Sequence, residues 1–204
     1  MNRRHLIVAS PLVCLTGPAA AALSSTPAQT AGPFYPRELP LDHDNDLVQV
    51  EGAGGRARGT VLHLDGRVRW PDGRPAEGCL VEIWQCDVNG RYHHPGDRRG
   101  VPRDPGFQGY GRTRCAPDGG YRFRTIRPVA YPGRTPHIHF AVRGPDREPL
   151  LVTQMYVRGE PGNNDDFLYR RLPEARRDQL SVALQPRLEA EAELAGRFDI
   201  VLGG

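Results

Sequence analysis

The chain has 204 residues, a formal net charge of +3 and 38% hydrophobic residues, which fits one globular domain rather than two. Its 24 glycines and 20 prolines favour a turn-rich β fold over a helical bundle. All 27 basic residues are arginines interleaved with acidic residues, and this pattern argues against a dedicated nucleic-acid surface.

Residues 1–22 have the layout of an export signal. A basic start (Arg3, Arg4) is followed by an apolar centre at residues 6–15 and by the small-residue run 19–22. The paired arginines fit twin-arginine export, and the apolar centre is too short to span a bilayer as a stable anchor. We therefore expect a periplasmic or secreted protein with no membrane anchor once the signal is removed.

Residues 23–56 are rich in Pro, Gly, Ser and acidic residues and predict an extended N-terminal arm. Such an arm could pack across a second copy of the chain, so the sequence is compatible with a homodimer. Residues 57–204 predict the single folded domain.

Within that domain, short strands alternate with Gly/Pro turns such as PDGRP at 71–75. The expected strands are residues 60–70, 79–86, 121–126, 137–144, 150–157 and 198–202. Residues 92–114 are expected to form a loop, and residues 173–184 the one helix. The pattern predicts an all-β sandwich, transthyretin-like or immunoglobulin-like, with an N-terminal arm and one short C-terminal helix.

Removal of the signal leaves three cysteines, Cys79, Cys86 and Cys115. Cys79 and Cys86 fall in one expected strand, roughly 23 Å apart, which is too far for a disulfide. A Cys86–Cys115 disulfide in an oxidising compartment and three buried free thiols both remain open.

The strand HIHFAVRG (137–144) alternates with a period of two. Ile138, Phe140 and Val142 are expected to face the core, and His137 and His139 the opposite side. The two imidazoles then stand about 6–7 Å apart at their Cα atoms and can bind one metal ion. Taken alone, the pattern also fits two polar residues that face solvent.

The residues near this strand narrow the choice of metal. No H-E-x-x-H motif occurs, and the nearest further donors are the phenols of Tyr92 and Tyr131. An unperturbed phenol has a pKa near 10, so only a strong Lewis acid holds it as phenolate at neutral pH. Two phenolates with two imidazoles suit trivalent iron better than zinc.

Six stretches, in order, resemble the intradiol ring-cleavage dioxygenases, the family of catechol 1,2-dioxygenases and protocatechuate 3,4-dioxygenases. They are QTAGPFYP (29–36), DGRPAEGCLVEIWQCDVNGRYHH (72–94), DPGFQGYGR (104–112), GGYRFRTIRP (119–128), YPGRTPHIHF (131–140) and LLVTQMYVRGEPGN (150–163). The resemblance implies a non-haem Fe(III) held by Tyr92, Tyr131, His137 and His139. It implies that O2 cleaves a catechol-type aromatic diol to a cis,cis-muconate-type dicarboxylic acid.

The resemblance also assigns roles to residues around the metal. Arg134 would stabilise negative charge on the bound substrate, Tyr131 would leave the iron and accept a substrate proton, and Gln154 would stand beside the ligands. The arm residues expected to line the substrate pocket are Gly32, Pro33 and Tyr35. The chain departs from the family at 129–130, where Val-Ala replaces the frequent Gly-Pro, and in a shorter interval before His137. The identity of the catechol derivative therefore stays open.

Two other functions compete with this reading. A non-catalytic, secreted transthyretin-like binding module would have the same strand pattern, but it has no need for both tyrosines beside the H-x-H. A zinc-dependent hydrolase could use His137 and His139, but the sequence places no third histidine or carboxylate close by.

Overall fold

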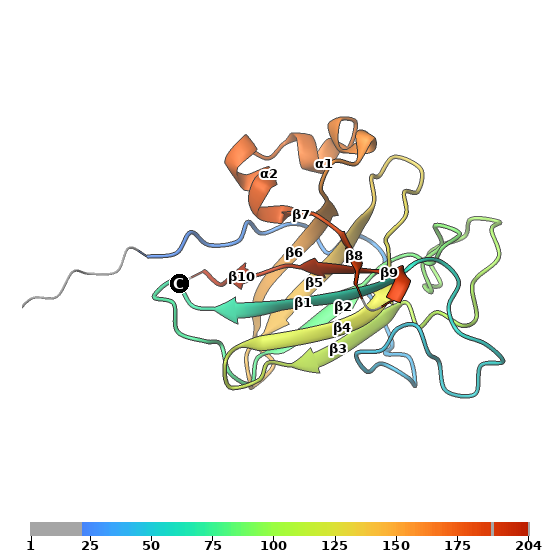
Figure 1. Cartoon of the computed structure of the whole chain (residues 1–204), viewed down its shortest axis with the longest axis horizontal. Helices are drawn as coiled ribbons and strands as arrows, with labels where there is room; N and C mark the ends of the chain where they lie inside the picture. Colours follow the sequence, from blue (N-terminus) through green and yellow to red (C-terminus); the bar gives the residue numbers. More distant parts are fainter. Residues whose placement is uncertain (1–21, 189, 204) are drawn as a thin grey trace, which may run out of the picture.

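The computed structural model describes residues 22–188 and 190–203, so the export signal expected at 1–22 lies outside the described residues except for Ala22. Two β-sheets pack face to face, which confirms the predicted all-β sandwich (Figure 1). The strands are β1 (Val61–Arg69), β2 (Leu80–Trp84), β3 (Tyr110–Arg114), β4 (Gly120–Ile126), β5 (His137–Arg143), β6 (Pro149–Val157), β7 (Ser181–Val182), β8 (Gln185–Arg187), β9 (Ala190–Arg197) and β10 (Ile200–Val201). The helical segments are η1 (Pro161–Asn164), α1 (Phe167–Arg170) and α2 (Glu174–Leu180).

The order of the strands places β5 in the interior of its sheet. In one sheet, β1 pairs with β4 along one edge, and along the other edge it pairs with β9 and then with β10; β8 pairs with β9. The second sheet has the order β3-β2-β5-β6-β7, and β5 pairs antiparallel with both β2 and β6. The strand that carries the two histidines is therefore fixed in register from both sides.

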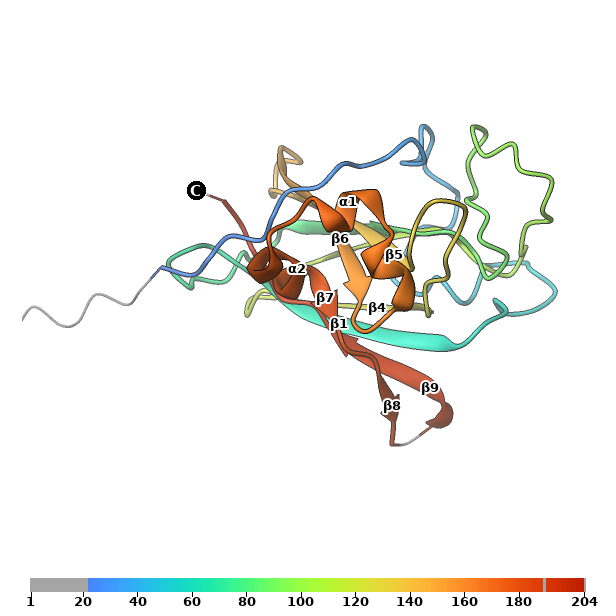
Figure 2. The same ribbon diagram turned by 90° about the horizontal axis from the view of Figure 1, so that it is seen from above.

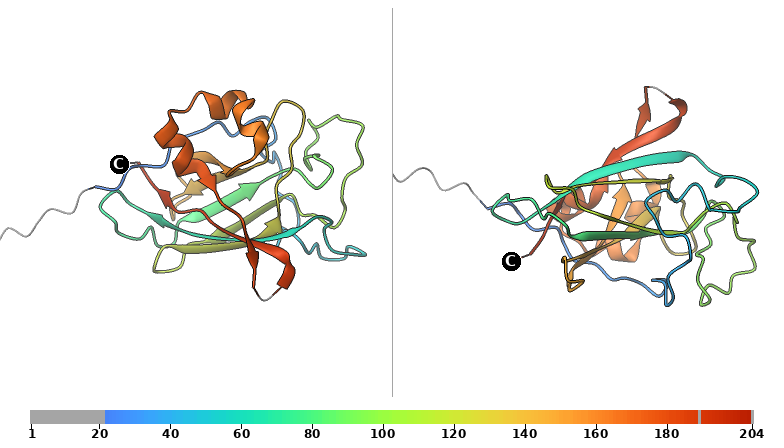
Figure 3. Two further views of the ribbon diagram at one scale, coloured as in Figure 1. Left: turned by 45° about the horizontal axis from the view of Figure 1, so that its top comes forward. Right: turned by 90° about the horizontal axis from the view of Figure 1, so that it is seen from below.

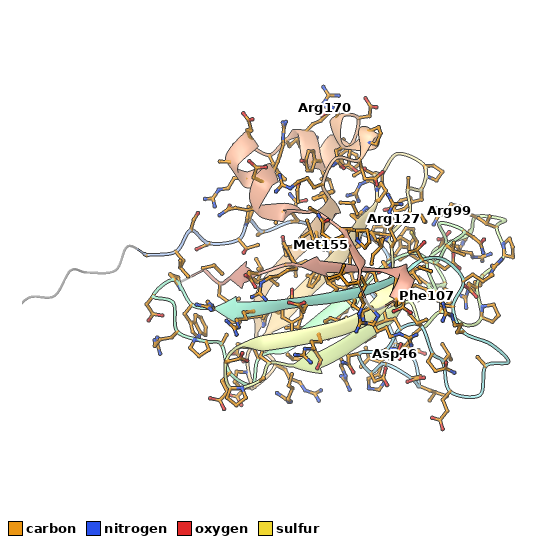
Figure 4. All side chains as sticks on the ribbon, in the orientation of Figure 1. Asp46, Arg99, Phe107, Arg127, Met155 and Arg170 are labelled. Carbon is orange, nitrogen blue, oxygen red and sulfur yellow. The ribbon has the colours of Figure 1, made fainter. Side chains whose placement is uncertain are left out.

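The core lies between the two sheets. Ile138, Phe140 and Val142 of β5 are fully buried there, beside Leu64 of β1 and Phe123 of β4, as the alternation predicted. Figure 4 shows the core from the side and labels Met155 of β6 near its middle, with the loops that carry Arg99 and Arg127 at one end of the molecule.

The N-terminal segment crosses the outer face of the second sheet without forming a strand (Figure 2). The Gln29 N–H donates to the Val152 carbonyl at 2.8 Å, and the Thr153 hydroxyl donates to the Pro27 carbonyl at 2.7 Å. These bonds tie the segment to β6, and Ala31, Phe34 and Tyr35 beyond them pack on the outer face against a cluster that includes Trp84 and Tyr92. The histidines on that face are consequently buried rather than exposed to solvent.

Several elements differ from the sequence prediction. Residues 110–114, expected in a loop, form β3 because they pair with β2. The helix expected at 173–184 ends at Leu180, and the next two residues form β7 beside β6 (Figure 3). The strands β8 and β9 were not expected, since AEAELAGR in β9 consists largely of good helix formers. Pairing of β9 with β1 overrides that preference, and the β8–β9 hairpin projects from the body.

All three described cysteines are buried free thiols. The Cys115 N–H donates to the Cys79 carbonyl at 2.8 Å, so these two residues are neighbours across β2 and β3. Cys86 packs in a different cluster, with Trp84 and Tyr92. The Cys86–Cys115 disulfide considered above is therefore not formed, and the free-thiol alternative is confirmed.

Within residues 22–188 and 190–203, no helix is long and apolar enough to cross a membrane.

Candidate metal centre

Four donor side chains meet at one end of the covered face. The ring centroids of His137 and His139, both on β5, lie 4.9 Å apart. The Tyr92 hydroxyl lies 3.4 Å from His137 Nε2. The Tyr131 ring lies 5.6 Å from the Tyr92 ring and 5.5 Å from the His137 ring, between centroids. The fold thus brings together all four residues that the sequence suggested as ligands.

The orientation of each imidazole is set by a neighbour. Nδ1 of His137 donates to the Thr135 carbonyl at 2.6 Å, which leaves Nε2 with a free lone pair toward Tyr92. A backbone carbonyl in this position is a common partner of metal-binding histidines. The His139 ring stacks on Trp84 with centroids 4.9 Å apart and planes 6° apart. Its Nδ1 atom is buried and has no hydrogen-bond partner among the described residues.

Burial keeps the four donors neutral in the absence of a cation. It lowers the pKa of His137 to about 4, and the charge of Arg134 acts in the same direction. Burial and the adjacent His137 hold the pKa of His139 well below its ordinary value. Burial raises the pKa of Tyr92 strongly and that of the less buried Tyr131 less, and the charge of Arg134 opposes the rise at both phenols.

This donor set fits a ferric ion. A trivalent cation would displace both phenol protons and turn the neutral cluster into two phenolate and two imidazole ligands. Within the described part of the chain, no group of three or more His, Cys, Asp or Glu side chains is placed to hold a metal. The zinc hydrolase alternative needs such a third ligand, and the structure does not supply one there.

Tyr92 reaches the cluster because the turn after β2 is tied down by carboxylates. Asp87 Oδ1 accepts from the backbone N–H groups of Asn89 and Arg91, at 2.8 and 3.1 Å, and Gly90 takes the left-handed φ of +74° that closes this turn. Asp97 Oδ2 then accepts from the Tyr92 N–H at 2.8 Å. The position of the tyrosine is thus determined by its backbone as well as by its ring contacts.

Arg134 lies beside the donors and is held at two nitrogens. Nη2 donates to Gln154 Oε1 at 2.6 Å, and Nε donates to Asp166 Oδ2 at 2.7 Å. The Gln154 amide is fully buried and donates in turn to the Thr30 carbonyl at 2.8 Å. Gln154 therefore connects Arg134 to the arm, and it is the β6 residue paired with His139 of β5.

The three arm residues suggested as pocket lining have different surroundings. Gly32 faces the site, because a Cβ at this position would lie 3.3 Å from His139 Cε1. Pro33 is exposed. The Tyr35 hydroxyl lies 3.2 Å from both carboxylate oxygens of Glu82, and its ring packs edge-on against Trp84. Tyr35 thus fixes the arm behind the histidine strand.

Sequence reasoning missed three residues of the site. Phe34 stacks on the Tyr92 ring with centroids 4.6 Å apart, Thr135 orients His137, and Asp166 binds Arg134. An Asp before the apolar FLYR segment is a helix N-cap signal. That signal could have located the start of α1, but it carries no information about a partner 32 residues earlier in the chain.

Comparisons with known proteins agree with this site. A family model described as dioxygenase matches residues 30–204. The chain is 40% identical over 173 residues to the protocatechuate 3,4-dioxygenase beta chain of Burkholderia cepacia, covering 81% of this chain and 73% of that protein. It is 33% identical over 166 residues to catechol 1,2-dioxygenase 1 of Acinetobacter lwoffii, covering 71% of this chain but only 50% of that protein.

Solved structures show the same fold. The dioxygenase domain of a dioxygenase carbohydrate-binding protein fusion from Streptomyces sp. SirexAA-E has a TM-score of 0.68 and 31% identity, covering 88% of this chain and 98% of that one. An intradiol ring-cleavage dioxygenase from Tetranychus urticae has a TM-score of 0.70 at 21% identity, covering 89% of this chain and 95% of that one. The chain belongs to the intradiol ring-cleavage dioxygenase family.

Proposed function

We propose that this protein is an iron-dependent enzyme that cleaves an aromatic 1,2-diol with O2 between the two hydroxylated carbons. The single observation that carries the proposal is the cluster of Tyr92, Tyr131, His137 and His139, with the Arg134 guanidinium held beside it. The product class is a cis,cis-muconate-type dicarboxylic acid.

The metal ligands and the residues beside them would have different roles in the reaction. A bound ferric ion would supply Lewis acidity toward the two oxygens of the diol. Tyr131 is the less buried of the two tyrosines, and burial raises its pKa less than that of Tyr92. Its phenolate oxygen is therefore the one suited to leave the cluster and to accept a proton from the diol.

Arg134 supplies fixed positive charge. Its side chain is only 9% exposed, and a guanidinium keeps its charge at every relevant pH. In a site from which the arm excludes water, such a charge stabilises the negative charge that builds up on the diol ring. Phe34 and Trp84 stack on the rings of Tyr92 and His139 and hold these two ligands in place.

The relatives support the substrate class. The names of the similar proteins specify protocatechuate, catechol and hydroxyquinol. We propose a 1,2-dihydroxybenzene for this chain as well. The shorter segment between Tyr131 and His137 leaves the substituents of the ring open, and a screen of substituted diols identifies them.

Labelling of the product tests the reaction. The purified, iron-loaded protein is incubated with catechol under 18O2, and the products are analysed by mass spectrometry. We expect a ring-opened dicarboxylic acid that contains both labelled atoms. A ring-opened aldehyde, or label in only one position with every 1,2-diol tested, would contradict the proposed reaction.

We further propose that the protein is exported and that residues 1–22 are removed. The support is the order of basic, apolar and small residues in that segment. Sequencing the N-terminus of protein recovered from the periplasm or medium tests this, and a chain that keeps Met1 and stays in the cytoplasm would contradict it.

A further inference from the structure

Asp166 is a buried carboxylate that joins three parts of the site. Its Oδ2 atom accepts from Arg134 Nε at 2.7 Å and from the Thr135 N–H at 3.0 Å. Its Oδ1 atom accepts from the N–H groups of Leu168 and Tyr169, at 2.9 and 3.0 Å, as the N-cap of α1. Both oxygens therefore have two donors each, and the side chain is fully buried.

Burying the ion pair of Asp166 with Arg134 costs desolvation free energy, so stability alone is a weak reason for it. Moving two charges out of water costs several kcal/mol, and apolar residues of similar size often stabilise a fold as well as a buried pair does. What the pair provides is a fixed orientation, because a guanidinium bonded at Nε cannot turn about its last torsion. Gln154 fixes a second nitrogen of the same group.

The same carboxylate also acts on the histidine strand. Asp166 accepts a hydrogen bond from the backbone N–H of Thr135, and the backbone carbonyl of the same Thr135 orients the His137 ring. On the solvent side, Phe167, the residue after Asp166, lies under the Arg134 guanidinium, with Cζ 5.6 Å from the ring centroid. Arg134 is thus hydrogen-bonded to Asp166, and the face of its guanidinium packs on the Phe167 ring.

We propose that Asp166 is a positioning residue for ring cleavage, which holds the Arg134 guanidinium where it meets the negative charge of the bound diol. This inference rests on the proposed function. It assigns to Asp166 an effect through Arg134, over and above its effect on the helix α1. A carboxylate that merely caps α1 would influence folding and not the reaction.

A double-mutant cycle separates these two roles. Asp166→Asn keeps an acceptor for the cap, since Asn and Asp cap helices about equally well, but it places an amide nitrogen where Oδ2 accepts from Arg134 and from the Thr135 N–H. Arg134→Met removes the guanidinium and keeps a long side chain. Asp165→Asn is the matched control, because Asp165 is the adjacent, exposed acidic residue and loses the same charge.

Each variant and the double variant are loaded with iron and measured in three ways. The kcat and KM for catechol are determined at saturating O2. The affinity for catechol without O2 is determined from the visible absorption spectrum. The thermal midpoint of the metal-free protein reports on folding. The cycle is evaluated from the kinetic constants and, independently, from the anaerobic affinities.

We expect Asp166→Asn to lower kcat about 100-fold, the cost of misplacing a reacting group by about 1 Å, with less change in KM. In the Arg134→Met background, the same substitution should cost a clearly smaller fold-loss in kcat, because only the contact with the Thr135 N–H is then left to lose. Asp165→Asn should match the wild type.

Two results would overturn the inference. One is a wild-type kcat in the Asp166→Asn variant. The other is an equal fold-loss in both backgrounds, which would show that Asp166 acts through Thr135 or through the fold and not through Arg134. An iron-loaded wild type that cleaves no 1,2-diol overturns the proposed function and this inference with it, and that result is obtained before any variant is made.

Discussion

The two faces of the second sheet are built from the same strands but by different rules. On the inner face, Ile138, Phe140 and Val142 of β5 pack into an apolar core. On the outer face, His137 and His139 of the same strand pack against aromatic rings and the N-terminal arm. Both faces are buried, so burial alone does not separate structural positions from functional ones.

The contact partners of the side chains do distinguish structural from functional positions. A core side chain needs only apolar neighbours of suitable volume, and many combinations satisfy that need. Each polar group of the outer face depends on particular partners, such as the Thr135 carbonyl for His137 and Trp84 for His139. Substitution of neighbouring residues on β5 should therefore damage different properties of the protein.

The largest effect is expected for a ligand. His139→Ala should lower activity and iron affinity by more than about 100-fold, because loss of a mere outer partner of a ligand already costs 10- to 100-fold. Iron content and ring cleavage are measured on the same preparation. The control is His63→Ala, a strand histidine of the other sheet paired with Glu193. If His139→Ala retains iron at the wild-type level, His139 is no ligand.

The adjacent core residue should show the opposite behaviour. Phe140→Ala should lower the free energy of unfolding by about 3–5 kcal/mol, since it leaves a cavity beside Tyr121 and Phe198. Urea denaturation measures this loss, and the fraction that remains folded should still bind iron. A loss below about 1 kcal/mol would show that the inner face is loosely packed.

A smaller loss is expected where the arm is fastened to the outer face. Glu82 is buried and accepts from the Tyr110 hydroxyl at 2.8 Å and from Arg143 Nε at 2.8 Å, besides its contact with Tyr35. Glu82→Gln should lower the free energy of unfolding by about 1.5–3 kcal/mol, the range for hydrogen bonds to a charged group.

The control for this substitution is Asp178→Asn, which breaks an exposed ion pair with Arg158 and should cost less than about 1 kcal/mol. Limited proteolysis of the arm gives a second measurement. The arm of the Glu82→Gln variant should be cleaved faster than the wild-type arm, and equal rates would show that Glu82 does not hold it.

The smallest effect concerns the thiols of the inner face. Burial raises the pKa of Cys115 to about 12 and also raises that of Cys79. Because the reactive thiolate forms only as the pH approaches the pKa, alkylation of the native protein by iodoacetamide should stay slow up to pH 9. Unfolding in urea should expose the thiols and restore ordinary rates. Fast modification of the native protein at pH 8 would contradict their burial.

The sequence predicted the inner face and the four donors better than it predicted what holds them. Alternation in β5 was enough to assign Phe140 and His139 to opposite faces, since a strand has a period of two. The strand β9 was missed because its residues favour a helix locally and pair with a distant strand.

Phe34 and Asp166 were missed for a related reason. Their partners, Tyr92 and Arg134, lie 58 and 32 positions away in the chain, and no local pattern encodes such contacts. Tyr35 illustrates the converse, because a motif marked it as pocket lining while the structure places its ring on Trp84 and its hydroxyl on Glu82. Motifs locate the chemistry, whereas the packing around it follows from the fold.

The most direct test of the metal centre is a visible absorption spectrum of the purified protein, with iron quantified on the same sample, before and after anaerobic addition of catechol. We predict about one iron per chain, a red-brown band from tyrosinate bound to ferric iron, and a shift of that band with catechol. A protein that stays colourless after reconstitution with iron would contradict the assignment of Tyr92 and Tyr131 as ligands.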